Sequence, residues 1–137
     1  MLTPDFTRYS LALLEGGQIL YCAGGSGLRP LWDALEKFQG RSGLILHDKV
    51  IGLAAAMLIV RSAIVVEIHT KVASRPAVIF LEKNGIILHA ADVTANILTR
   101  DQSAICPGEI IALGCSNADE FMKSIRAFLG FQAKGSH

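Results

Sequence analysis

The order of strand-like and helix-like segments most restricts how this 137-residue chain can fold. Apolar runs at residues 9–14 and 19–23 flank Gly16 and Gly17, and a Gly-Gly pair can adopt the positive φ angles of a tight hairpin turn. After this hairpin, segments with helical spacing alternate with short apolar strands. The predicted order is therefore β-β-α-β-α-β-α-β, followed by further helices.

The residues at the segment ends support this order. Asp48 is placed to cap the second helix, Ser74 to cap the third, and Asn117 with Glu120 to form a capping box for a final helix that ends near Leu129. Between residues 93 and 113 the pattern weakens to short helical turns and loop. The predicted helices span residues 30–39, 49–60 and 75–84, and the predicted strands span 44–47, 64–69 and 86–89.

These segments predict one domain with an α/β fold. Helical crossovers make the later strands parallel, whereas the hairpin is antiparallel. The simplest architecture is a three-layer α/β/α sandwich on a mixed five-stranded sheet with an N-terminal hairpin. We expect a single domain over residues 1–137 with a core at about 9–129, and residues 130–137 as a tail whose Lys-Gly-Ser-His end resembles an expression scar.

The apolar content limits the partners of the chain. Apolar residues make up 51% and the mean hydropathy is +0.42. The longest apolar run, residues 50–60, is shorter than the ~20 residues that a membrane helix needs, so we predict no membrane segment and a homo-oligomer, most simply a dimer.

Charge and cysteine content argue against nucleic-acid binding and against a disulfide scaffold. A net charge of +1 with scattered basic residues gives nucleic-acid binding no electrostatic support. Three cysteines without regular spacing, and an N-terminus unlike a signal peptide, favour a reducing compartment over a disulfide scaffold. The expected location is the cytoplasm.

Polar residues follow the predicted parallel strands at their carboxyl ends, where ligands of α/β sheets tend to bind. These ends carry His47-Asp48, His69-Thr70 and residues 89–92. Asp48 is a helix cap on the simplest interpretation, but at this edge its carboxylate could also act as a base or hold a hydroxyl group.

Cys106 is the second candidate reactive group. It precedes Pro107 and a predicted helix, whose positive end favours a thiolate, although a small buried cysteine is the alternative. A zinc site made from His47, Cys106 and Cys115 is conceivable, but no helix-borne ligand pair such as Cys-x-x-Cys is present. We therefore predict neither a metal site nor a cofactor.

Two stretches carry a resemblance to a known family. Residues 44–57 (LILHDKVIGLAAAM) and 99–109 (TRDQSAICPGE) resemble the signature segments of an uncharacterised bacterial and archaeal family, described only as a domain of unknown function with a cytidine-deaminase-like fold. The resemblance implies a deaminase-type sandwich. It does not imply zinc-dependent deamination, because the His-or-Cys-Ala-Glu and Pro-Cys-x-x-Cys stretches of those enzymes are absent.

Candidate site residues follow from the resemblance. Asp48 and Cys106 are the candidate catalytic residues. This chain has Leu53 where the family often has lysine, which argues against shared catalysis. The candidate ligand-binding residues are Lys49, Gly52, Arg100, Asp101, Pro107 and Glu109.

Three functions remain open. The first is a zinc-independent enzyme, and the second a non-catalytic sensory domain, each with a site for a small nucleotide-like or phosphorylated metabolite at the Asp48/Cys106 edge. The third is a homo-oligomeric assembly role. The sequence does not decide whether the chain is an enzyme.

Overall fold

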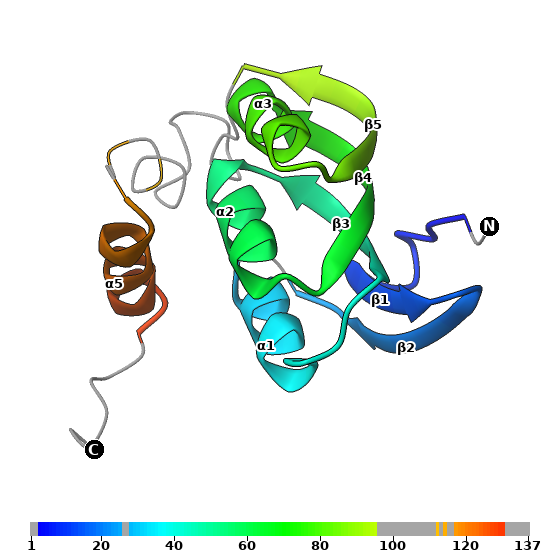
Figure 1. Ribbon diagram of the computed structural model, residues 1–137. Helices are drawn as coiled ribbons and strands as arrows, with labels where there is room; N and C mark the ends of the chain where they lie inside the picture. The colour runs from blue at the N-terminus through cyan, green and yellow to red at the C-terminus, as the bar shows by residue number, and fades with distance from the viewer. Residues whose placement is uncertain (1–2, 26–27, 96–111, 113, 115–116, 131–137) are drawn as a thin grey trace.

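The computed structural model describes residues 3–25, 28–95, 112, 114 and 117–130 (Figure 1). Within them, strands and helices alternate in the predicted order. The elements are β1 (Leu11–Glu15), β2 (Gln18–Ala23), α1 (Arg29–Lys37), β3 (Leu44–Ile51), α2 (Leu53–Ser62), β4 (Val65–Ser74), α3 (Arg75–Lys83), β5 (Ile87–Thr94) and α5 (Ala118–Phe128).

The strands form one mixed sheet in the order β2-β1-β3-β4-β5. β1 is antiparallel to both β2 and β3, whereas β3, β4 and β5 are parallel. The hairpin turn uses Gly16 at a φ of +62°, a conformation that suits glycine because it has no Cβ. The predicted five-stranded sheet with an N-terminal hairpin is confirmed.

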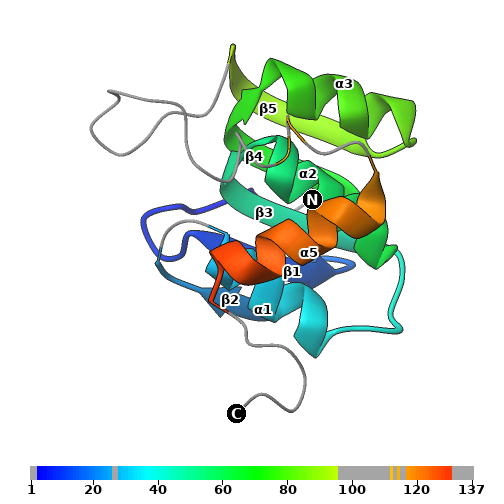
Figure 2. The same cartoon turned by 90° about the vertical axis from the view of Figure 1, so that its left-hand side faces the viewer.

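The described helices lie on one side of this sheet. α1, α2 and α3 cover one face (Figure 1), and α5 crosses the outside of α1 and α2 (Figure 2). Phe121 and Ile125 of α5 are buried in the same core as Trp32 of α1. Phe128, at the end of the same helix, is 44% exposed. The α/β class is confirmed, with three layers in the order sheet, α1–α3 and α5.

A second, smaller core lies on the other face of the sheet. Tyr9, Ala12 and Leu14 are buried there, with Phe6 and Ile45 packed against them. The chain just before β1 therefore covers the β1–β3 part of this face.

The helix ends agree with two of the three predicted caps. The Ser74 hydroxyl accepts a hydrogen bond from the amide of Ala77 at 3.3 Å, and the Asn117 side chain accepts one from the amide of Glu120 at 2.8 Å. No helix in the described ranges is long and apolar enough to cross a bilayer.

The predicted cap at Asp48 is wrong. β3 continues to Ile51, and Gly52 is the N-cap of α2. The reason is that Val50 and Ile51 are β-branched residues that extend the strand, whereas the alanine run that favours a helix begins only at Ala54.

The parallel strands therefore end later than predicted. β4 continues to Ser74 and β5 to Thr94, across the start of the segment where short helical turns were expected. His47, His69 and His89 consequently lie inside strands and not at their carboxyl ends, which corrects the predicted position of these residues.

Candidate functional site

Three histidines lie side by side across the parallel strands. His47 of β3 pairs with His69 of β4, which pairs with His89 of β5. Because neighbouring side chains on a strand point to opposite faces, the histidines point away from the helices. The residues that precede them pack with the helix-side core: Leu46, Ile68 and Leu88.

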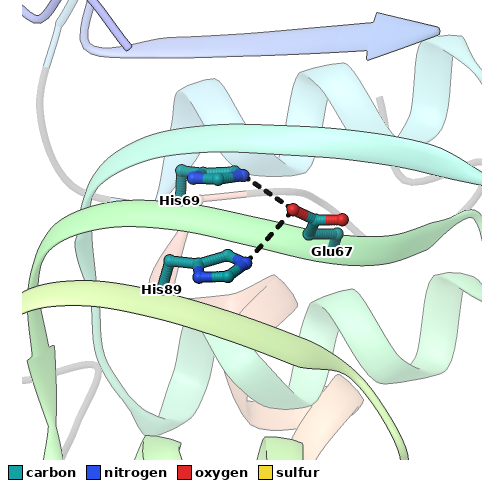
Figure 3. Close-up of side chains that lie close together, drawn as sticks. All are labelled: Glu67, His69 and His89. Atoms are coloured by element: carbon teal, nitrogen blue, oxygen red, sulfur yellow. Dashed lines mark hydrogen bonds and ion pairs between the residues drawn. The ribbon is translucent and has the colours of Figure 1, made fainter. Parts of the chain in front are cut away.

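Glu67 links two of these histidines (Figure 3). Its Oε2 lies 2.8 Å from Nε2 of His69 and 3.2 Å from Nε2 of His89. The two imidazole rings stack with their centroids 4.5 Å apart and an interplanar angle of 18°. The side chains of Glu67 and His69 are 15% and 16% exposed, and that of His89 is 54% exposed. The three side chains thus form a cluster that is half-buried at one end and open to water at the other.

His47 is fully buried behind this cluster. Its ring meets the ring of His69 edge to face at a centroid distance of 5.4 Å. The Tyr9 hydroxyl oxygen accepts a hydrogen bond from the Asp5 amide at 3.2 Å and forms a second hydrogen bond with Nδ1 of His47 at 2.9 Å. The other ring nitrogen of His47, Nε2, has no hydrogen-bond partner among the described residues.

The environment keeps His47 neutral. Burial lowers the pKa of His47 to about 4, and the neighbouring His69 acts in the same direction. The unpaired Nε2 of this neutral buried imidazole costs about 1–3 kcal/mol in lost hydrogen bonding.

Asp48 belongs to the opposite face of the sheet. It pairs across the strands with Leu11 and Thr70, and Leu11 is part of the core beneath the helices. Burial raises the pKa of the Asp48 carboxyl to about 8, although the backbone amides of Val50 and Lys49 donate hydrogen bonds that lower it. Asp48 is therefore protonated at neutral pH, and its carboxyl group can both donate and accept hydrogen bonds.

The other predicted site residues fall into two groups. Gly52 lies at the start of α2, four residues after Asp48, and Lys49 is exposed. Since Lys49 directly follows Asp48 on β3, strand alternation turns the two side chains to opposite faces. The remaining candidates lie outside the described residues: Arg100, Asp101, Cys106, Pro107 and Glu109.

Comparison with known protein families gives a match over most of the chain. Residues 5–129 match the model of a family described as a domain of unknown function, DUF1893. The chain belongs to the DUF1893 family. No curated protein matched it.

A solved structure supports the fold of this DUF1893 domain. This chain is similar to the crystal structure of a DUF1893 family protein, TM1506, from Thermotoga maritima, with a TM-score of 0.80 and 24% sequence identity. The match covers 90% of this chain and 82% of that chain. At this identity the likeness concerns the fold alone.

Sequence reasoning did not find the Glu67, His69 and His89 cluster of the DUF1893 chain. A usable signal was present, since each of the three parallel strands carries an aliphatic residue followed by histidine. Placing these pairs at one register would have aligned the histidines, but register depends on contacts between distant segments.

A surface cleft offers a different kind of site on the helix side. It has a volume of about 230 Å³, lies between α1, α2 and α5, and is lined by Trp32, Leu58 and Met122 among others. Of the predicted site residues that the structure describes, neither Asp48, Lys49 nor Gly52 lines it. Its volume is below the roughly 300–1,000 Å³ typical of pockets for small organic ligands.

Proposed function

We propose that this DUF1893 domain binds a small nucleotide-like or phosphorylated metabolite where β3 leads into α2, with Asp48 contacting the ligand. The observation that carries the proposal is the position of Asp48, a half-buried carboxyl group that forms no ion pair within the described part of the chain. A carboxyl group removed from water without a basic partner destabilises the fold, and such groups are concentrated at functional sites.

The protonated form of Asp48 suits a nucleobase. It offers one hydrogen-bond donor and one acceptor side by side, which complements the amide-like edge of a pyrimidine or purine ring. The site also lies near the carboxyl ends of parallel strands, where open α/β sheets bind ligands. Arg100 remains the proposed cation for a phosphate group. Lys49, the other cation predicted from the sequence, points to the opposite face of the sheet from Asp48 and is therefore no longer proposed as a contact of this ligand.

We extend the proposal to chemistry without zinc. Asp48, whose pKa lies near 8, could transfer a proton at neutral pH, and Cys106 is the proposed nucleophile. We retain a cytidine-deaminase-like fold for the domain, and the absent deaminase motifs argue against zinc-dependent deamination. A cytoplasmic location suits an unpaired reactive thiol.

The alternative is a sensory domain that binds the same ligand without turnover. Cys106→Ser separates the two, because it should abolish turnover in an enzyme and leave ligand affinity nearly unchanged in a sensor. Iodoacetamide at neutral pH gives an independent test. An activated Cys106 should be alkylated faster than Cys22 and Cys115, and labelling at equal rates would remove it from the proposal.

Calorimetric titration with nucleoside monophosphates and their nucleosides tests ligand binding. We expect the wild-type chain to bind at least one of them, Asp48→Ala to lose that binding, and Asp92→Asn to keep it. Asp92 is an exposed acid on β5 and serves as the control for a lost carboxyl group. Equal binding by the wild type and Asp48→Ala would refute the site, and no binding to the wild type would refute the ligand class.

A second copy of the chain is the proposed protein partner. β5 is an outer strand of the sheet, and its Ile87 and Val93 are 55% and 45% exposed. An outer strand with exposed apolar side chains favours pairing with another chain.

A further inference from the structure

We propose that Glu67, His69 and His89 form a binding site for a divalent transition-metal ion such as Zn²⁺ on the face of the sheet opposite Asp48. The site is separate from the proposed metabolite site, so each can fail without the other. The geometry of the three side chains carries this inference (Figure 3).

The three candidate ligand atoms already converge. One ring nitrogen of His69, one ring nitrogen of His89 and a carboxylate oxygen of Glu67 all lie within 4.8 Å of one another. Ligand atoms bound at about 2.0–2.1 Å around a tetrahedral zinc ion are roughly 3.3 Å apart. The contacts of Glu67 Oε2 with the two histidines, 2.8 and 3.2 Å, differ from that spacing by only a few tenths of an ångström. Binding the ion also requires the stacked rings of His69 and His89 to turn so that a nitrogen lone pair of each points at the ion, and the 54% exposed side chain of His89 is the one that can turn into solvent.

The sheet holds these ligands in place. Glu67 and His69 lie two residues apart on β4 and so point to the same face, and the pairing of His69 with His89 sets the third ligand on β5. The rings of His69 and His89 already lie against each other on these neighbouring strands. Buried His47 packs edge to face against His69 and acts as a positioning residue. Sites on strands hold ligand geometry more tightly than sites on loops.

The chemistry of the donors selects the ion. Two imidazole nitrogens and one carboxylate oxygen suit Zn²⁺, Co²⁺ or Ni²⁺ better than Mg²⁺ or Ca²⁺, which prefer oxygen ligands. Three protein ligands leave at least one coordination position to water, as in catalytic zinc sites. The 54% exposure of His89 places that position at the solvent, so we expect an exchangeable ion.

Calorimetric titration of the metal-free protein with Zn²⁺ tests the site. We expect one ion per chain at this site and a loss of affinity of about 100-fold or more in Glu67→Gln, His69→Gln and His89→Gln, because losing even an outer-sphere partner costs 10- to 100-fold. Asp92→Asn, which removes an acidic side chain outside the cluster, should bind Zn²⁺ as the wild type does. Since His89 is exposed, His89→Gln should fold normally, and circular dichroism checks this.

A second readout separates this site from metal bound by cysteines. Co²⁺ at the proposed site has no thiolate ligand, so its spectrum should lack the intense thiolate charge-transfer band, and Cys106→Ser/Cys115→Ser should leave the spectrum unchanged. Nuclear magnetic resonance should show Zn²⁺-dependent changes at the side chains of His69 and His89. Zn²⁺ affinity that is equal in the wild type and His89→Gln, or a thiolate band with Co²⁺, would overturn the proposal.

Discussion

The hydroxyl group of Tyr9 lies 2.9 Å from Nδ1 of buried His47, and this hydrogen bond ties the chain before β1 to the centre of the sheet. Tyr9→Phe would leave Nδ1 without its hydrogen-bond partner. We expect the free energy of unfolding to fall by about 1–3 kcal/mol, the cost of an unsatisfied buried polar group. Urea unfolding measures this change.

Tyr21→Phe is the matched control. Tyr21 is half-buried, and its ring packs against Phe38. Because its hydroxyl group has no hydrogen bond to the described residues, removing it should change stability by less than about 0.5 kcal/mol. Equal losses in the two variants would contradict the role given to the Tyr9 hydroxyl.

Asp48 should make the stability of the domain depend on pH. The folded state keeps this carboxyl protonated up to a pKa of about 8, whereas the unfolded chain ionises it above about 3.8. Between these values the folded state binds more protons, so the free energy of unfolding falls as pH rises. The contribution of one group is at most about 1.4 kcal/mol per pH unit.

Asp48→Asn should remove this contribution. Its stability should therefore fall less than that of the wild type between about pH 4 and pH 8. Denaturant unfolding at several pH values measures the difference, with Asp92→Asn as the control. Parallel curves for the wild type and Asp48→Asn would show that Asp48 ionises normally.

The packing of α5 gives a prediction about stability alone. Phe121 is 1% exposed, whereas Phe128 on the same helix is 44% exposed. Phe121→Ala should cost about 3–5 kcal/mol, because it leaves a cavity in the core. Phe128→Ala should cost less than about 1 kcal/mol. Thermal unfolding of both variants measures these losses of stability. Similar losses in the two variants would contradict the packing of α5 against the core through Phe121.

The proposed self-association can be tested at β5. Ile87→Lys places a charge on the outer strand and should shift the chain from dimer to monomer in light scattering. Ile79→Lys is the control, since Ile79 is 58% exposed on α3. A monomeric wild type, or a dimer that survives Ile87→Lys, would count against pairing through β5.

Local patterns predicted much of this fold. The hairpin at Gly16, the caps at Ser74 and Asn117, and the alternation of strands and helices all depend on residues close in sequence. The boundary at Asp48 was misjudged because a good cap residue there competes with two β-branched residues after it, and the strand continues through them. Neither the contact of Tyr9 with His47 nor the alignment of the histidines could be predicted, because both depend on register between distant segments.

The candidate site was predicted only in part. Asp48 was chosen as a helix cap near a ligand edge, whereas the structure places it inside β3, where burial raises the pKa of its carboxyl. Its proposed meeting with Cys106 lies outside the described residues and stays a prediction. The cluster at Glu67 was overlooked because zinc ligands were sought among His and Cys and in helix-borne pairs such as Cys-x-x-Cys, whereas its members are one glutamate and two histidines on two neighbouring strands.

Amide nuclear magnetic resonance spectra of the chain, recorded while nucleoside monophosphates are added, test directly whether a metabolite binds at Asp48. We expect concentration-dependent shifts centred on Asp48, Gly52 and the first turn of α2, which are lost in Asp48→Ala and kept in Asp92→Asn. Shifts confined to β4 and β5 around Glu67 and His89, or no shifts with any of these ligands, would contradict a metabolite site at Asp48.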